Sequence, residues 1–169
     1  MFVNRIRQEV IYTPFKVFST STRAYLEEQD DWVEAIGCQP HSSWEDARFS
    51  VHNHILEHRV ANYKKILPIR DPYARVISQY KWRCKRLGEI SFEDWFMLES
   101  RQCVLSAVTE IYKYDQLMTL DDMIQQWPGF PHENHIEKEV IIPSQFIPII
   151  DYIHYSDFQA IKELGRPVR

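Results

Sequence analysis

The sequence predicts an α/β fold built around a mainly parallel sheet. Short apolar segments alternate along the chain with longer segments of helical periodicity, which is the order typical of strands joined by crossover helices. Two of the predicted strand-to-helix junctions are rich in hydroxyl and basic side chains. The chain has 169 residues, of which 44% are hydrophobic, so a single domain over 1–169 can bury a core of its own.

The elements of the N-terminal half follow from apolar runs and capping residues. The run EVIY ends before Thr13-Pro14, which predicts a strand, and Ser19, Thr20 and Ser21 can cap the helix behind it. Asp71 is a good N-cap with Pro72 at the first helical position, so a helix follows the apolar run KILPI. The predicted strands lie at 9–12, 48–52 and 65–69, and the predicted helices at 22–29, 55–63 and 72–86.

The C-terminal half repeats the alternation. Ser91 can cap a helix, VTEIYKY alternates as a strand should, and Gly165 can end the last helix. Residues 128–148 form a long loop interrupted by prolines. The predicted strand lies at 108–114, and the predicted helices at 92–99, 120–127 and 155–164.

The charge distribution favours some partners over others. The formal net charge is −4, which argues against a general nucleic-acid partner. The sign is not uniform, because residues 64–86 carry eight lysines and arginines against the single acid Asp71. That stretch predicts a place for an anionic ligand within an acidic protein.

Three further features bear on the compartment. No apolar run approaches the roughly 18 residues of a membrane helix, so no membrane partner is expected. The segment 1–12 is too short and too charged for a signal peptide. Cys38, Cys84 and Cys103 form no CxxC pair, so neither a zinc site nor a disulfide framework is predicted. The expected location is the cytoplasm, and the sequence leaves the oligomeric state open.

The first polar junction is PFKVFSTS at 14–21. Between a strand and a helix, backbone N–H groups and the helix dipole form an anion site. Lys16 adds a point charge, and the neighbouring hydroxyls add hydrogen-bond donors. The segment is not a Walker A loop, because GxxxxGK[ST] is absent. Taken alone, it also fits a capped helix beside a surface lysine.

The second polar junction is RDPYARVISQY at 70–80. Arg70 follows the strand at its carboxyl end, where open α/β sheets bind ligands. Ser78 lies roughly on the side of the helix that carries Arg75, three residues earlier. The alternative interpretation is an amphipathic helix with an N-cap and a solvated arginine.

These two junctions resemble those of a known family. Arg-Asp-Pro-Tyr-x-Arg-x-x-Ser-x-Tyr resembles the 3′-phosphate-binding motif of sulfotransferases that use 3′-phosphoadenosine 5′-phosphosulfate (PAPS). Lys-x-x-Ser-Thr-Ser at 16–21 resembles the 5′-phosphosulfate loop of the same family. Order, spacing and predicted context agree. Weaker likenesses lie at 114–117 and, to carbohydrate-type members, at 157–165, so the resemblance runs over about residues 8–165.

The resemblance implies a fold, a reaction and a set of ligand residues. The fold would be a P-loop-like three-layer arrangement, with a mainly parallel central sheet flanked by helices, in a single domain over 1–169. The reaction would transfer a sulfuryl group from PAPS to a hydroxyl acceptor without a metal ion. A carbohydrate is the first expectation for the acceptor, and small alcohols, phenols and protein tyrosine stay open. The donor-binding residues would be Lys16, Val17, Phe18, Ser19, Thr20, Ser21, Arg70 and Ser78.

Sulfuryl transfer also needs a base for the acceptor proton and a cation at the leaving phosphate. Lys16 suits the second task, and histidine suits the first because its pKa is near neutral. His52 and His54 follow the predicted strand at 48–52, and His-x-His occurs near this place in heparan-type 2-O-sulfotransferases. We expect His54 to be the base and His52 its support, with their order open and Glu57 in reserve. A hydrogen-bonded histidine pair without a catalytic role is the alternative.

A candidate closing loop lies further along the chain, in PHENHIEK at 131–138. In the family, a loop bearing asparagine and lysine often closes over the donor or the acceptor in this region. A solvated loop is the alternative. The residues concerned are His132, Asn134, His135 and Lys138.

Two departures from the family pattern keep other functions open. Phe18 stands where the first loop usually has a small residue, commonly glycine, which lets the backbone approach a phosphate. The chain is also short between the second junction and Tyr114, where acceptor contacts often originate. Nucleotide binding without catalysis is therefore a second function class. A P-loop phosphotransferase is a third, disfavoured because a Walker A loop and a clear acidic Mg²⁺ motif are absent from the sequence.

Overall fold

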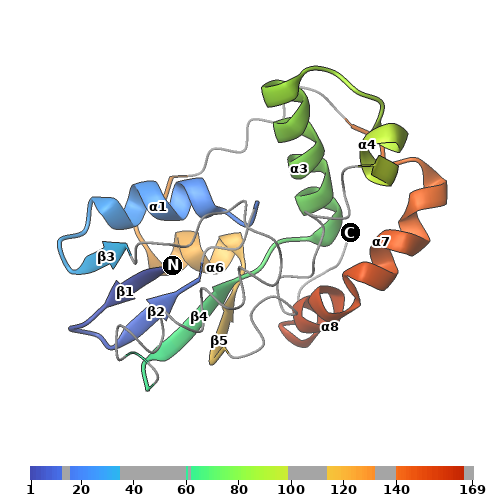
Figure 1. The fold of residues 1–169 in the computed structure, drawn as a ribbon. Coiled ribbons are helices and arrows are strands. Elements are labelled where there is room, and N and C mark those ends of the chain that lie inside the picture. Colours follow the sequence, from blue (N-terminus) through green and yellow to red (C-terminus); the bar gives the residue numbers. More distant parts are fainter. Residues whose placement is uncertain (13–15, 35–59, 61, 99–113, 132–139, 166–169) are drawn as a thin grey trace. The chain divides into compact units, whose positions relative to one another are not determined.

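The protein is described by a computed structural model whose residues group into two compact units (Figure 1). Unit 1 comprises residues 1–69 and 110–133, and unit 2 comprises 70–109 and 134–169. Each unit is described by itself. The residues that the structure describes are 1–12, 16–34, 60, 62–98, 114–131 and 140–165.

Unit 1 contains a five-stranded sheet among its described residues. Figure 1 shows the strands side by side in the order β3-β1-β2-β4-β5. The pairs β2–β4 and β4–β5 are parallel, whereas β1 pairs with both β2 and β3 in antiparallel fashion. The strands are β1 (Phe2–Asn4), β2 (Glu9–Ile11), β3 (Trp32–Glu34), β4 (Lys64–Pro68) and β5 (Gln116–Met118).

The prediction of an α/β fold is confirmed, but the sheet is mixed. The sequence correctly indicates β2 and β4, where branched apolar residues are buried. It misses β5, because the predicted strand at 108–114 ends before Gln116, and it misses β1 and β3. β1 and β3 have three residues each, which leaves little room for a period of two to show. A P-loop-like, mainly parallel core is not confirmed, because these two strands add antiparallel pairings to the described sheet.

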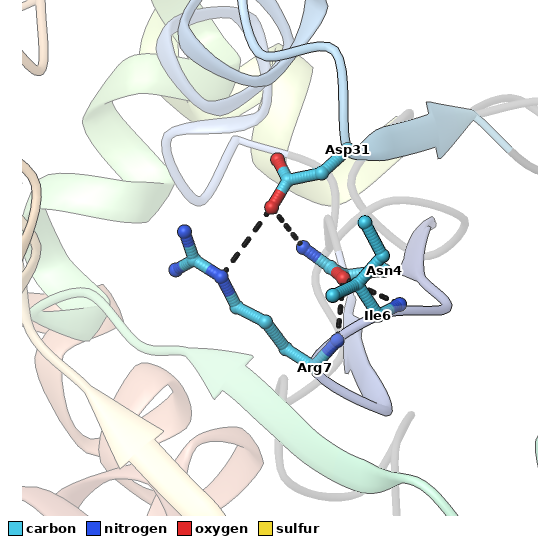
Figure 2. Close-up of polar contacts among 4 residues, drawn as sticks. All are labelled: Asn4, Ile6, Arg7 and Asp31. Carbon is cyan, nitrogen blue, oxygen red and sulfur yellow. Dashed lines mark hydrogen bonds and ion pairs between the residues drawn. The ribbon is translucent and has the colours of Figure 1, made fainter.

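A buried asparagine holds the turn between β1 and β2. The Asn4 side-chain oxygen accepts hydrogen bonds from the N–H groups of Ile6 and Arg7, at 3.0 and 2.8 Å. Its amide nitrogen donates to Asp31 at 2.8 Å, and Arg7 pairs with the same carboxylate (Figure 2). The buried amide is thus satisfied on both sides, and it ties the hairpin to the chain entering β3.

Two helices of unit 1 pack on the same face of the sheet. They are α1 (Ser19–Glu27) and α6 (Leu120–Gln126). Tyr25 stacks on Trp127, just beyond α6, with ring centroids 5.6 Å apart. The buried cluster between these helices and the strands contains Phe2, Ile11, Leu26, Ile66, Met118, Met123, Trp127 and Phe130.

The described part of unit 2 is helical. Its helices are α3 (Pro72–Leu87), α4 (Phe92–Leu98), α7 (Ile147–Ile153) and α8 (Tyr155–Glu163), with a 3₁₀ turn at Ser144–Phe146. An aromatic cluster joins α3 and α4 to the 3₁₀ turn and α7, and many ring pairs in it are tilted or edge-on. Its buried members are Val76, Phe92, Trp95, Phe96, Phe146 and Ile150.

Most of the predicted helices that fall on described residues are confirmed. Asp71 caps α3, Ser91 accepts from the Asp94 N–H at the start of α4, and Gly165 follows α8 with φ of 69°. Helix α7 was not predicted, because its first two residues were assigned to the loop at 128–148 and the rest to no element. Prolines at 143 and 148 hid its short apolar turn. The predicted strand at 48–52 lies outside the described residues. Of the predicted helix at 55–63 the structure describes residues 60, 62 and 63, and of the predicted strand at 108–114 it describes residue 114. None of these four residues is in a helix or a strand.

Candidate functional site

The first polar junction enters α1 through two left-handed residues. Lys16 has φ of 59° and Phe18 has φ of 53°, while Val17 between them is fully buried. Such alternation lets successive N–H groups point to one side, the arrangement that forms anion-binding nests. The junction follows β2, which the Tyr12 N–H extends by donating to the Ile66 carbonyl at 3.0 Å.

No side chain among the described residues caps the start of helix α1. The N-cap is Phe18, whose carbonyl accepts from the Thr22 N–H at 2.8 Å. The prediction that a hydroxyl of 19–21 caps this helix is wrong, because these residues lie inside its first turn. The first N–H groups of an α-helix have no partner within the helix. An anion is the natural partner for them, because the helix dipole adds attraction.

A residue that the sequence argument missed lies in the same turn. Thr22 is fully buried, and its side-chain oxygen Oγ1 has no hydrogen-bond partner among the residues that the structure describes. Buried hydroxyls are normally satisfied. Thr22 thus offers one further polar atom beside Ser21 (half-buried) and Thr20 (exposed). The only sequence signal for Thr22 is that it ends the run Ser-Thr-Ser-Thr.

Phe18 adopts the conformation that glycine would adopt there. A left-handed conformation costs a non-glycine residue about 1–2 kcal/mol. The half-buried ring packs against the sheet cluster of unit 1, and its burial offsets part of that cost. The departure from the family pattern therefore leaves the left-handed turn in place.

The second junction continues β4 into α3. The Ile69 N–H donates to the Met118 carbonyl at 2.8 Å, which extends the parallel pairing to the last residue before Arg70. Asp71 then caps α3, because its carboxylate accepts from the Ala74 N–H at 2.8 Å. Pro72 occupies the first helical position. The predicted start of the helix is confirmed.

Arg70 is the cation at this junction. It is partly buried, and desolvation lowers its pKa, with a further lowering from the positive charge of Arg75. The carboxylate of Asp71 acts in the opposite direction. A guanidinium stays protonated at neutral pH despite such shifts. Arg70 therefore presents a positive charge that has lost part of its hydration.

Ser78 lies in the second turn of α3, six residues from Pro72 and roughly 9 Å along the helix. It is half-buried. Arg75, on a similar side by sequence spacing, has no exposed surface and forms an ion pair with Asp157 of α8, with Nη1 and Oδ2 3.8 Å apart. Arg75 is thus a packing residue of unit 2, whereas Ser78 keeps partial exposure.

Several predicted residues lie outside the described part of the chain. They include the candidate bases and the candidate closing loop, so their roles stay predictions. Among the described residues, no group of three acidic, histidine or cysteine side chains could hold a metal ion, and no helix could span a membrane. The predicted residues outside the described ranges are His52, His54, Glu57, His132, Asn134, His135 and Lys138.

Comparison with known proteins connects the two junctions. A family model described as the sulfotransferase family matches residues 15–138, well over half of the 169 residues. The match spans both polar junctions and the candidate bases, and it ends before α7 and α8. No curated protein and no solved structure matches the chain.

Proposed function

The chain belongs to the sulfotransferase family, and we propose that it transfers the sulfuryl group of PAPS to a hydroxyl group of a carbohydrate, in the cytoplasm. The observation that carries this proposal is topological. The two polar junctions follow β2 and β4, which are adjacent and parallel in unit 1. Adjacent parallel strands end at the same edge of a sheet, and ligands of open α/β sheets bind at that edge.

The residues of the first junction suit the 5′-phosphosulfate. The uncapped start of α1 offers backbone N–H groups, and Lys16, Ser21 and Thr22 add a charge and hydroxyls. Left-handed Lys16 and Phe18 support a backbone that turns its N–H groups toward an anion. This proposed contact needs no metal ion, because main-chain donors and a lysine supply the compensating charge.

The residues of the second junction suit the 3′-phosphate. Arg70 offers a planar set of donors that can bind two phosphate oxygens at once. Its partial burial strengthens a charged hydrogen bond, because less water competes for the guanidinium. Ser78 would donate its hydroxyl from the second turn of α3.

The donor supplies the activated sulfuryl group, and the chain supplies position, charge and a base. Lys16 would stabilise the negative charge that grows on the leaving phosphate oxygen. His54, or Glu57 in reserve, would accept the proton of the acceptor hydroxyl as the sulfur–oxygen bond forms. His52 would support that base. A base of this kind contributes about 10²–10⁴-fold to the rate.

One specific observation favours a second function, nucleotide binding without catalysis. The Phe18 ring occupies a position that a small residue usually has, and it lies within the loop that would hold the reacting phosphosulfate. If the ring limits access to that phosphate, the chain would bind the nucleotide and transfer nothing. The proposal of transfer therefore requires that turnover be measured as well as binding.

Transfer of labelled sulfate from PAPS to a panel of saccharides, phenols and tyrosine peptides tests the proposed function. We expect sulfated saccharide as the product, and loss of most turnover in His54→Ala with nucleotide affinity retained. Label in phenols or peptides alone would replace the carbohydrate acceptor. Nucleotide binding with no labelled product from any acceptor would establish the non-catalytic alternative.

A further inference from the structure

Helices α3 and α8 are joined by a buried ionic cluster. Arg75 and Asp157 have no exposed surface, and Arg75 Nη1 lies 3.8 Å from Asp157 Oδ2. The same oxygen lies 3.1 Å from Nδ1 of His154, which is also fully buried. A carboxylate next to a guanidinium is an acceptor, so the Nδ1–H group of His154 donates to it. The Arg75–Asp157–His154 cluster therefore centres on one carboxylate.

Burial makes this cluster sensitive to the loss of one charged partner. A guanidinium removed from water is tolerated only when an opposite charge and hydrogen bonds compensate for its lost hydration. Removing the carboxylate would take from the buried Arg75 guanidinium the opposite charge of Asp157, which favours movement of the side chain toward water. Because Arg75 lies in the first turn of α3, such a movement would act on the backbone of that turn.

The proposed 3′-phosphate residues lie on either side of the first turn of α3, because Arg70 precedes the helix and Ser78 lies in its second turn. Arg75 stands between Arg70 and Ser78 in the sequence, and its charge lowers the pKa of the Arg70 guanidinium, with a smaller influence than burial, which also lowers it, and Asp71, which raises it. Neutralisation of Arg75 by Asp157 limits this repulsion. The position and the charge of Arg75 therefore both bear on Arg70.

A second contact joins the start of α3 to the C-terminal helices. The Tyr73 hydroxyl donates to a carboxylate oxygen of Asp151 in α7. Its ring lies against Phe158 of α8, with centroids 5.3 Å apart. The first turn of α3 is thus held by α7 and α8 at two residues, Tyr73 and Arg75. Both α7 and α8 lie beyond the matched residues 15–138.

We propose that Asp157 is a positioning residue for the donor's 3′-phosphate. Its carboxylate holds Arg75, and through Arg75 it fixes the first turn of α3, which Arg70 precedes and Ser78 follows. The inference rests on the proposed function, because it concerns the phosphate that those two residues would bind. Asp157 itself has no exposed surface and does not touch the ligand in this account.

Two nucleotides that differ only in the 3′-phosphate test the inference. Affinities for adenosine 3′,5′-bisphosphate and adenosine 5′-phosphate are measured by calorimetry on the whole chain. The native protein should prefer the bisphosphate by about ten- to a hundredfold, the value of one charged hydrogen-bonded contact. In Asp157→Asn this preference should fall about two- to thirtyfold, while affinity for the monophosphate stays the same. Arg75→Met should lower the preference for the bisphosphate in the same way. It replaces Asp157→Asn as the test variant if Asp157→Asn does not fold.

Controls separate position from stability. Phe146→Leu weakens the aromatic cluster of unit 2, where Phe146 contacts Phe92 and Phe96, and it should lower the thermal midpoint without changing the preference. Asp94→Asn, which alters a carboxylate at the start of α4, should change neither the thermal midpoint nor the preference for the bisphosphate. A native preference that persists in folded Asp157→Asn and Arg75→Met would overturn the positioning role alone. No preference in the native protein would overturn the proposed 3′-phosphate site, and the inference with it.

Discussion

Phe18 shows at the scale of one residue how a departure from a family pattern can be absorbed. The residue takes φ of 53°, a region that a bulky side chain rarely enters. Its ring contacts the sheet cluster of unit 1, so the side chain both strains the backbone and contributes packing. Replacing the ring by smaller groups separates these two contributions.

Phe18→Gly should be more stable than Phe18→Ala by about 1 kcal/mol. Both variants lose the ring, and only glycine is free of the left-handed cost. At the exposed helical position Ala24 the sign should reverse, with Ala24→Gly costing about 1 kcal/mol. Urea unfolding measures all three variants. A Phe18→Ala variant as stable as Phe18→Gly would contradict the left-handed conformation.

Lys16→Ala should reduce turnover more than it reduces affinity for the bisphosphate product. The reason is that Lys16 would face the charge that develops in the transition state, which the product lacks. Lys64 at the opposite, amino end of β4 is the matched control, and Lys64→Ala should change neither quantity. An equal loss of affinity and turnover in Lys16→Ala would make Lys16 a binding residue only.

Tyr73 should give the protein an alkaline stability dependence. Burial, reinforced by the hydrogen bond to Asp151, raises the pKa of Tyr73 to about 12. A raised pKa in the folded state means that this stabilisation is fully present below pH about 10 and is lost as the pH rises towards about 12. Because the contact is exposed, the effect should be below about 1 kcal/mol. The stability difference between the native protein and Tyr73→Phe should thus shrink over that pH range in urea unfolding, and a constant difference would contradict the shift.

At the scale of elements, the start of α3 depends on its cap. Asp71→Ala should cost about 0.5–2 kcal/mol of stability, because the Ala74 N–H loses its acceptor. Asp71→Asn should retain most of the stability, since asparagine caps equally well. Thermal and urea unfolding of the two variants measure the difference. Equal losses in both would show that the charge of Asp71 matters and the cap does not.

The elements also show what a single sequence can predict. Helix α3 and strand β4 were predictable because a proline-preceded cap and a buried apolar run are local signals. Strands β1, β3 and β5 were not, because each has only three residues, and β3 and β5 pair with strands far from them along the chain. The same reason hid the Arg75–Asp157 pair, whose partners are 82 residues apart in number. Arg75 could be recognised as part of a motif, but its burial could not.

At the scale of the whole molecule, the residues that match the sulfotransferase family model include both strand-to-helix junctions. The sequence predicts Lys16–Ser21 and Arg70–Ser78 as donor contacts through their resemblance to the family's two motifs, and these roles stay predictions. The structure adds the left-handed turn, the uncapped start of α1 and the buried support of α3. Each of these features concerns anion binding, so the shared claim is that the protein binds a nucleotide by its phosphates without metal.

Calorimetric titration with adenosine 3′,5′-bisphosphate tests that claim most directly. The bisphosphate should bind in chelator, without Mg²⁺, and more tightly than ATP with or without Mg²⁺. Arg70→Ala should weaken binding about ten- to a hundredfold, while Arg86→Ala, which alters the last turn of the same helix, should leave it unchanged. No binding of the bisphosphate, or tighter binding of ATP with Mg²⁺, would contradict the account.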